Sequence, residues 1–422
     1  LTANEGTLAL TGSAAKYLTN ATIASNATLL LDGTTLNTRG GTTASGAGTM
    51  EVTNSVSLNN SIANNTINAA VKIDAGSTLN ANNSSSYRNT LAGGLSGAGD
   101  LVVQTGDTRV AGANTLSGTI TINSGATNRM MDAGGSNNFV NNGSLYFSNS
   151  TAKVYSGNIS GTGAIFTDGS GGTTLSGNIS SSGPLTMNSA SLPLTLLGSN
   201  SFNGLNIAGS GGVKIGKVSS LGVGLISNTM SSGKISIDAS AGTGNDWTIG
   251  NNISAGNTNT DVMAFAPGAG NTLRLSGLVS GSGQLKVSGG GDLYVNNTSN
   301  SYSGGTEIGT GRILVGDGRV LGSGVVNFGT TTNSTLVATA DMTLTNSVTI
   351  GSGSLNGYTA NIDTGNKNMA INGVIANKAG NANGGMLVKL GTGSLSLSRT
   401  NTYTGSTTVS EGTLNVSGDI TA

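Results

Sequence analysis

The sequence contains no cysteine and no histidine among its 422 residues. Without cysteine it cannot form disulfide bonds or thiolate metal sites. Without histidine it cannot build histidine-dependent catalytic triads or histidine metal sites, and it lacks the usual general base near neutral pH. We therefore expect no cofactor, and we expect the chain not to be an enzyme.

Charged residues are also scarce, at 9% of the chain, and the 18 Lys and Arg residues balance the 18 Asp and Glu residues. Proteins that bind nucleic acids need clustered Lys and Arg with a basic balance, and a polybasic membrane anchor has the same requirement. No apolar run approaches the roughly 20 residues that span a bilayer. The composition predicts neither nucleic-acid binding nor a membrane-spanning chain.

Hydrophobic residues make up only 35% of the sequence and aromatic residues only 4%. The 70 glycines are accompanied by only 3 prolines, which excludes collagen. Disorder usually comes with high net charge and no periodicity, whereas here the net charge is zero and Leu, Ile and Val alternate with polar residues throughout. A narrow solenoid needs few apolar residues per turn, so this composition fits a β-solenoid.

The clearest repeat lies at residues 387–420. Three short alternating runs, at 395–397, 407–409 and 413–416, are separated by glycine-containing turns, which is the pattern of strands buried on one face. Each run is too short to stand alone. The unit therefore needs neighbours of its own kind to bury its apolar face.

A polar corner motif, Asn-x-aromatic-x-Gly, connects two of these runs and recurs upstream. Glycine adopts strained corner backbone without penalty, and asparagine tolerates it. We expect the aromatic residues to pack at corners because they are the largest side chains that a thin core can bury. The predicted structural repeat positions are Asn401, Tyr403 and Gly405; Asn300, Tyr302 and Gly304; Asn200, Phe202 and Gly204; and Asn114 with Gly118.

This repeated pattern resembles the autotransporter-associated β-strand repeat. The match is close at 387–420 and 275–315, recognisable at 93–130 and loose at 157–215. The resemblance implies a right-handed parallel β-helix outside a bacterium, commonly the passenger part of a surface or secreted protein. It brings no catalytic residues with it.

We predict one continuous β-solenoid over residues 1–422, a single elongated rod. If each turn uses about 20 to 25 residues, within the usual range for repeat solenoids, the rod has roughly 17 to 20 turns. It would have divergent turns at 1–92, loose repeats at 93–260 and the best-formed repeats at 261–422. Residues 13–18 are the only plausible helical turn near the start. The chain begins at Leu1 without a signal peptide, so we expect that peptide to have been removed and the protein to be extracellular or on a bacterial surface.

The two ends of the chain have similar sequences. Gly6, Leu8 and Leu10 match Gly412, Leu414 and Val416 in spacing. Solenoid ends expose unpaired strand edges, and stable ones normally carry polar caps. Two interpretations follow: the chain is an excised piece of a longer passenger, or its subunits join end to end. In the second case the predicted contact residues are Gly6, Leu8, Leu10, Leu414 and Val416.

Three functions fit this architecture. The first is a surface passenger with an adhesin or spacer role, whose partners would be a host or neighbouring-cell surface or glycans. The second is the subunit of a self-assembling extracellular fibre. The third, a glycan-cleaving enzyme, needs carboxylates along one groove. Its candidate residues are Asp100, Asp107 and Arg109; Asp317 with Arg312 and Arg319; and Asp246 beside Trp247. The alternative interpretation is that these are scattered turn residues.

Overall fold

The computed structural model describes residues 1–238, 241–329, 334–351, 358–380 and 384–420. The chain forms two compact units, Leu1–Leu205 with Ser219–Val223, and Asn206–Val218 with Gly224–Ala422. Within the described residues, regular structure consists of β-strands and two short 3₁₀ turns, η1 (Val218–Leu221) and η3 (Gly318–Leu321). Strand β26 (Leu205–Ile207) and η1 include residues of both units.

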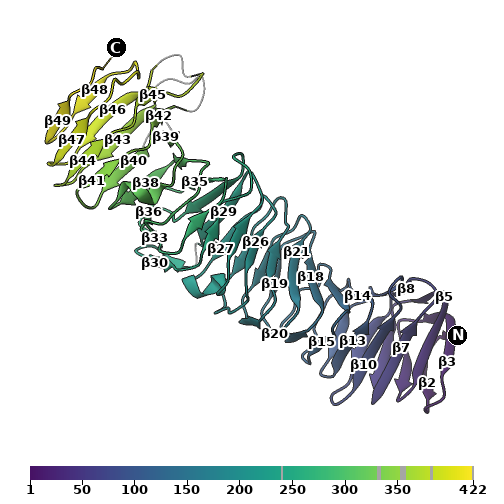
Figure 1. Cartoon of the computed structure of the whole chain (residues 1–422). Helices are drawn as coiled ribbons and strands as arrows, with labels where there is room; N and C mark the ends of the chain where they lie inside the picture. The colour runs from purple at the N-terminus through teal and green to yellow at the C-terminus, as the bar shows by residue number, and fades with distance from the viewer. Residues whose placement is uncertain (239–240, 330–333, 352–357, 381–383, 421–422) are drawn as a thin grey trace. The chain divides into compact units, whose positions relative to one another are not determined.

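Strands of the first unit stack side by side, in purple to teal in Figure 1. β2, β4, β6, β9 and β12 form a five-stranded sheet, and most of the others form a second, larger sheet. The strands are β1 (Thr2–Ala3), β2 (Gly6–Thr11), β3 (Lys16–Ile23), β4 (Ala27–Asp32), β5 (Thr35–Ser45), β6 (Thr49–Thr53), β7 (Ser55–Asn60), β8 (Asn65–Ile67), β9 (Ala70–Ile73), β10 (Thr78–Asn83), β11 (Arg88–Leu91), β12 (Leu95–Gly97), β13 (Asp100–Thr105), β14 (Asp107–Val110), β15 (Ile120–Ile122), β16 (Thr127–Met130), β17 (Phe139–Asn141), β18 (Ser144–Ser148), β19 (Lys153–Tyr155), β20 (Ile159–Gly161), β21 (Ala164–Asp168), β22 (Thr173–Leu175), β23 (Ile179–Ser181), β24 (Leu185–Met187) and β25 (Leu194–Leu196).

Turns of the second unit are three-sided, because strands from three sheets follow one another along the chain. β42, β43 and β44, for example, belong to three different sheets. The strands are β27 (Val213–Ile215), β28 (Ile226–Asn228), β29 (Gly233–Ile237), β30 (Asp246–Ile249), β31 (Ile253–Ser254), β32 (Val262–Ala266), β33 (Thr272–Leu275), β34 (Val279–Ser280), β35 (Gln284–Val287), β36 (Asp292–Val295), β37 (Thr306–Ile308), β38 (Gly311–Val315), β39 (Val326–Phe328), β40 (Ser334–Ala338), β41 (Met342–Leu344), β42 (Val348–Ile350), β43 (Thr359–Asp363), β44 (Asn368–Ile371), β45 (Ile375–Asn377), β46 (Met386–Leu390), β47 (Ser394–Leu397), β48 (Thr407–Val409) and β49 (Thr413–Val416).

Successive turns pair in parallel and mostly in register. Leu293 pairs with Leu273, and Leu293 in turn pairs with Ile313 on the following turn. These turns have the length that the sequence predicts. Other turns are longer, since Met263 pairs with Gly233, much further back along the chain. The predicted turn length is therefore right for part of the chain, and loops between strands lengthen the rest.

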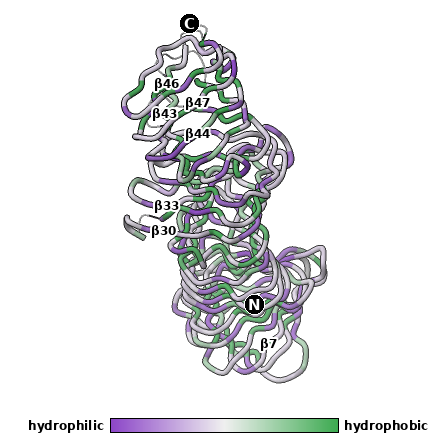
Figure 2. The backbone as a smooth tube through the Cα atoms, turned by 60° about the vertical axis from the view of Figure 1, so that its left-hand side comes forward, coloured by the Kyte–Doolittle hydropathy of each residue, from purple (hydrophilic) through white to green (hydrophobic). Residues whose placement is uncertain are grey.

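The core of each unit is a narrow column of aliphatic side chains that point inward from alternate strand positions. In β36, for example, Leu293 and Val295 are fully buried while Asp292 and Tyr294 face outward. Figure 2 shows the same alternation of apolar and polar stretches along the tube. Period-two alternation is what strands with one buried face require.

The predicted all-β parallel β-solenoid is confirmed in both units. Its handedness, the single-rod arrangement and the division of one continuous domain into three segments stay predictions. The predicted helical turn at 13–18 is wrong, because Lys16–Ile23 forms strand β3. Leu18 is buried there, and β3 pairs in parallel with β5. The hydrogen bonds between strands and the burial of Leu18 thus outweigh the local helix preference of Ala14 and Ala15.

Candidate functional surfaces

The corner asparagines hydrogen-bond to the backbone of adjacent turns. The Asn300 Oδ1 accepts from the Val279 N–H at 2.8 Å, and its Nδ2 donates to the Val320 carbonyl at 2.8 Å. One buried side chain therefore connects three successive turns. Asn200 repeats this arrangement with the Ile179 N–H at 2.9 Å and the Ser220 carbonyl at 2.8 Å.

The other two corner asparagines vary the scheme. The Asn401 Oδ1 accepts from the Ile375 N–H at 2.9 Å, but its Nδ2 donates within its own turn, to the Arg399 carbonyl at 2.8 Å. The Asn114 Nδ2 donates to the Asn137 Oδ1 at 2.6 Å. Buried polar groups need such partners, and these side chains find them inside the solenoid, not at its surface.

The aromatic corner residues Phe202, Tyr302 and Tyr403 are completely buried. The Tyr302 hydroxyl shares a hydrogen bond with Thr306 Oγ1 at 2.7 Å, and Tyr403 makes the same contact with Thr407 at 2.6 Å. Burial raises the pKa of both tyrosines. These rings pack inside the solenoid and present no surface to a ligand.

The corner glycines lie where consecutive turns come closest. A Cβ on Gly118 would lie 1.9 Å from the Gly99 carbonyl oxygen, and one on Gly304 2.4 Å from the Gly283 carbonyl carbon. At Gly405 the nearest atom would be the Gly385 carbonyl oxygen, at 2.4 Å. Gly204 has a φ of 106°, a conformation that L side chains rarely adopt. No larger residue fits these corners without movement of the backbone.

The candidate catalytic carboxylates of the second unit are held in ion pairs. The Arg274 guanidinium binds Asp246 with two hydrogen bonds of 2.6 and 2.7 Å. Asp317 pairs with Arg319 at 2.7 Å, whereas Arg312 pairs with Asp292 at 2.7 Å instead of joining them. Hydrogen bonds from the arginines lower the pKa of both Asp246 and Asp317. A carboxyl group with a lowered pKa is ionised near neutral pH and cannot serve as a general acid.

Trp247 and the candidate carboxylates of the first unit have other surroundings. Trp247 follows Asp246 in β30, at the position that pairs with the buried Leu273. Asp100 accepts from the Thr119 N–H at 2.7 Å, and the Asp107 Oδ2 lies 3.1 Å from the Arg109 Nε. Of these candidates, Asp107 and Arg109 belong to a larger cluster.

That cluster is an arginine–aromatic ladder on the outward face of β14, β16, β18 and β21. Register places Arg109, Arg129, Tyr146 and Phe166 on four successive turns. The Arg129 guanidinium carbon lies 3.8 Å from the centre of the Tyr146 ring. The Tyr146 and Phe166 rings stack with centroids 4.5 Å apart and planes 12° apart. These side chains form a column of planar groups outside the core.

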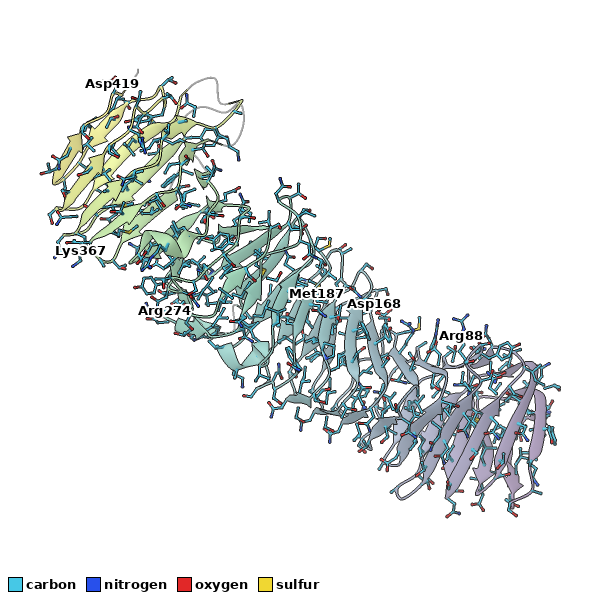
Figure 3. All side chains as sticks on the ribbon, viewed as in Figure 1. Arg88, Asp168, Met187, Arg274, Lys367 and Asp419 are labelled. Atoms are coloured by element: carbon cyan, nitrogen blue, oxygen red, sulfur yellow. The ribbon has the colours of Figure 1, made fainter. Side chains whose placement is uncertain are left out.

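Two carboxylates flank the arginine–aromatic ladder. The Asp107 Oδ2 lies 3.9 Å from the Arg129 Nε, and the Asp168 Oδ2 lies 3.4 Å from the Arg129 Nη1. The Ser148 hydroxyl donates to Asp168, which Figure 3 labels. Arg129, Phe166 and Asp168 were not among the residues predicted from the sequence. The available signal was an aromatic residue at an outward position in both Ser144–Ser148 and Ala164–Asp168, where alternation calls for a polar one.

The second unit also carries an open groove of about 640 Å³ between η3 and the outward face of β41, β44 and β47. Its lining is mixed: short polar side chains and the Asp317–Arg319 pair are joined by Met342, Met369 and Ala370. Asp341 on one edge accepts from the Asn368 N–H at 2.8 Å. The groove offers hydrogen bonds but no aromatic ring.

The residues predicted for end-to-end contact lie on edge strands. β2, with Gly6, Leu8 and Leu10, is at the edge of its five-stranded sheet, and β49, with Leu414 and Val416, is at the edge of a four-stranded sheet. Gly6 is exposed, Leu8, Leu10 and Leu414 are partly exposed, and Val416 is 41% exposed. A contact between copies through these residues stays a prediction.

Membrane-spanning helices and metal clusters are both absent from the described residues. No helix in this part of the chain is long and apolar enough to cross a membrane. In the same described ranges, no three His, Cys, Asp or Glu side chains lie together in a way that could hold a metal ion.

Comparison with known families identifies the repeats. The model of the passenger-associated-transport-repeat family matches residues 280–315 and 387–416. These segments contain two of the corner motifs, Asn300 to Gly304 and Asn401 to Gly405. Neither the curated proteins nor the solved structures gave a significant match. Residues 280–315 and 387–416 are thus passenger-associated-transport repeats, in which the buried corner asparagine accepts a backbone hydrogen bond from the preceding turn of a parallel β-solenoid.

Proposed function

We propose that this chain is a non-enzymatic extracellular passenger of a bacterial surface protein, with an adhesin or spacer role. The observation that carries the proposal is the presence of two passenger-associated-transport repeats in the second unit. Repeats of this kind imply a secreted or surface location. The absence of cysteine fits export through an oxidising periplasm, because stray disulfides would obstruct an unfolded chain.

A mechanical role agrees with the way the structure uses its functional groups. Corner asparagines and tyrosines, the residues that a ligand site would employ, are buried; the asparagines hydrogen-bond to adjacent turns and the tyrosines to a threonine of their own turn. The candidate carboxylates Asp246 and Asp317 are ion-paired with lowered pKa values. What remains for recognition is the outer surface, which consists largely of uncharged Thr, Ser and Asn.

The location can be tested on cells that produce the protein. Antibodies raised against the purified chain would be applied to intact cells and to permeabilised cells, with an antibody against a cytoplasmic protein as control. We expect equal labelling of the chain in both samples and labelling of the control only after permeabilisation. Labelling of the chain that appears only after permeabilisation would contradict the proposal.

A second candidate is an extracellular fibre built from copies joined end to end. The observation that favours it is the partial exposure of apolar residues on the edge strands β2 and β49. Exposed strand edges are templates for pairing with another chain. Electron microscopy of the purified chain over a concentration series tests it: filaments that lengthen with concentration support the fibre, and single particles at every concentration rule it out.

A further inference from the structure

The arginine–aromatic ladder gathers two residue types that are rare in this protein. Aromatic residues are 4% of the sequence and charged residues 9%. Tyr146 and Phe166 nevertheless stack against each other on one outward face, within a cluster that also contains Arg109 and Arg129 and the carboxylates Asp107 and Asp168. Core packing does not explain this face, because the fully buried Leu145 and Phe147 fill the inward positions of the same strand.

The column of planar groups ends at Phe166. Arg129 covers one face of Tyr146, and the other face lies against Phe166. On the far side of Phe166 the register places Thr186 of β24. Thr186 carries no ring, so the stack of planar groups ends at Phe166, which remains partly exposed.

Polar groups beside this ring face suit a hydroxylated ligand. Asp168 lies just beyond Phe166 on β21, accepts from Ser148 and pairs with Arg129. Carboxylates and guanidinium groups form strong, directional hydrogen bonds, and Ser148 adds a hydroxyl. The two arginines balance the two aspartates, so the cluster carries no net charge to attract a phosphate or sulfate.

We infer that the arginine–aromatic ladder binds an uncharged glycan. A sugar ring would place its apolar C–H face on Phe166, extending the stack by one layer, and its hydroxyl groups would hydrogen-bond to Asp168 and Ser148. Aromatic rings supply apolar area at a fixed orientation, and a few polar groups around them set specificity. This inference gives the proposed adhesive role a ligand class and rests on that role.

Calorimetric titration of the purified whole chain tests the inference. The probes are cellohexaose, mannohexaose and laminarihexaose, with heparin as an anionic comparison. We expect at least one neutral hexasaccharide to bind with a Kd below about 1 mM. The Tyr146→Thr/Phe166→Thr double variant should weaken that binding at least about tenfold, because threonine keeps strand propensity but removes both rings.

Tyr294→Thr is the matched control. Tyr294 also faces outward beneath an arginine, with the Arg274 guanidinium carbon 4.8 Å from its ring centre, but the next position in register is Leu314 and not a second ring. The Tyr294→Thr variant should bind the neutral hexasaccharide as tightly as the unaltered chain does. Circular dichroism shows whether the variants fold. If the double variant does not fold, the single Phe166→Thr variant is used for the same titration.

Three results would overturn the inference: no neutral hexasaccharide binds, the double variant binds as well as the unaltered chain, or heparin alone binds. These results concern the purified protein, whereas the surface location is measured on cells. Failure of the glycan site is therefore distinguishable from failure of the proposed function.

Discussion

At the scale of the residue, buried polar side chains join successive turns at the corners, beside the aliphatic core. Asn300 and Asn200 each satisfy a backbone donor and a backbone acceptor on different turns. An unpaired buried backbone group costs about 1–3 kcal/mol, so an asparagine that satisfies two such groups stabilises the corner more than an apolar residue of its size would.

Replacement of Asn300 tests this account. Asn300→Ala leaves the Val279 N–H and the Val320 carbonyl without their side-chain partner. We expect the free energy of unfolding to fall by about 2–4 kcal/mol. Urea denaturation followed by the fluorescence of Trp247, which lies in the same unit, measures it. The exposed Asn296 is the matched control, and Asn296→Ala should change stability by less than about 0.5 kcal/mol. Equal effects of the two substitutions would contradict the proposed role of Asn300.

Asp132 provides a second test at this scale. Its backbone has a φ of 55°, and its Oδ1 accepts from the N–H groups of Ser150 and Thr151 at 2.8 and 2.9 Å. Burial acts to raise the pKa of Asp132, but hydrogen bonds from Ser150 and Thr151 outweigh it and lower the pKa below the ordinary 3.8.

A lowered folded-state pKa makes the Asp132 contribution depend on pH. The stabilisation is complete above the ordinary pKa of 3.8 and is lost as pH falls through the lower folded value. The free energy of unfolding of the unaltered chain should therefore exceed that of the Asp132→Asn variant by about 1 kcal/mol at neutral pH. This difference should shrink at pH values below 3.8. Denaturation of both proteins over this pH range, followed by circular dichroism, measures it. A difference independent of pH would show that the charge of Asp132 is not involved.

At the scale of the element, the solenoid depends on corners where two turns almost touch. Parallel strands stack about 4.8 Å apart, and at Gly304 the backbone of the preceding turn occupies the space that a side chain would need. The sequence could point to these corners because Asn, an aromatic residue and Gly recur there at fixed local spacing.

Gly304→Ala tests the close approach. The added methyl group would lie 2.4 Å from the Gly283 carbonyl carbon and 2.5 Å from its oxygen, so the turns must separate. We expect a loss of about 1–3 kcal/mol in unfolding free energy, measured by thermal denaturation with circular dichroism. Gly250→Ala is the control, since the nearest atom to its added methyl would be the Ser276 Oγ at 3.9 Å. If both variants unfold at the same temperature, the close approach of the two turns does not explain why residue 304 is a glycine.

The outward ladder could not be predicted in the same way. The stretch of chain from Arg129 to Tyr146 is shorter than the stretch from Tyr146 to Phe166, although each pair lies on adjacent turns. Unequal turn lengths hide which residues are neighbours, and a register shift of one residue moves a side chain to the other face. Asp107 and Arg109 were found as candidates because they are close in sequence. Their association with Arg129 and the aromatic rings depends on the register between turns.

At the scale of the whole molecule, both units use the same construction despite differences in sequence. The second unit contains the two segments that match the repeat family, and the first unit, outside those segments, forms the same parallel ladders. Composition explains this outcome, because alternating Leu, Ile and Val with glycine at corners is sufficient for a narrow stacked core, and the full motif is not required.

Amide hydrogen exchange, read by mass spectrometry on the purified chain, tests the central claim that successive turns are joined by backbone ladders. We expect slow exchange in peptides that cover β10 and β13 of the first unit and β36 and β38 of the second, because these strands pair on both sides. Peptides over the exposed residues Thr298 and Ser299 should exchange faster. Rapid exchange throughout either unit, as in an unfolded chain, would contradict the account.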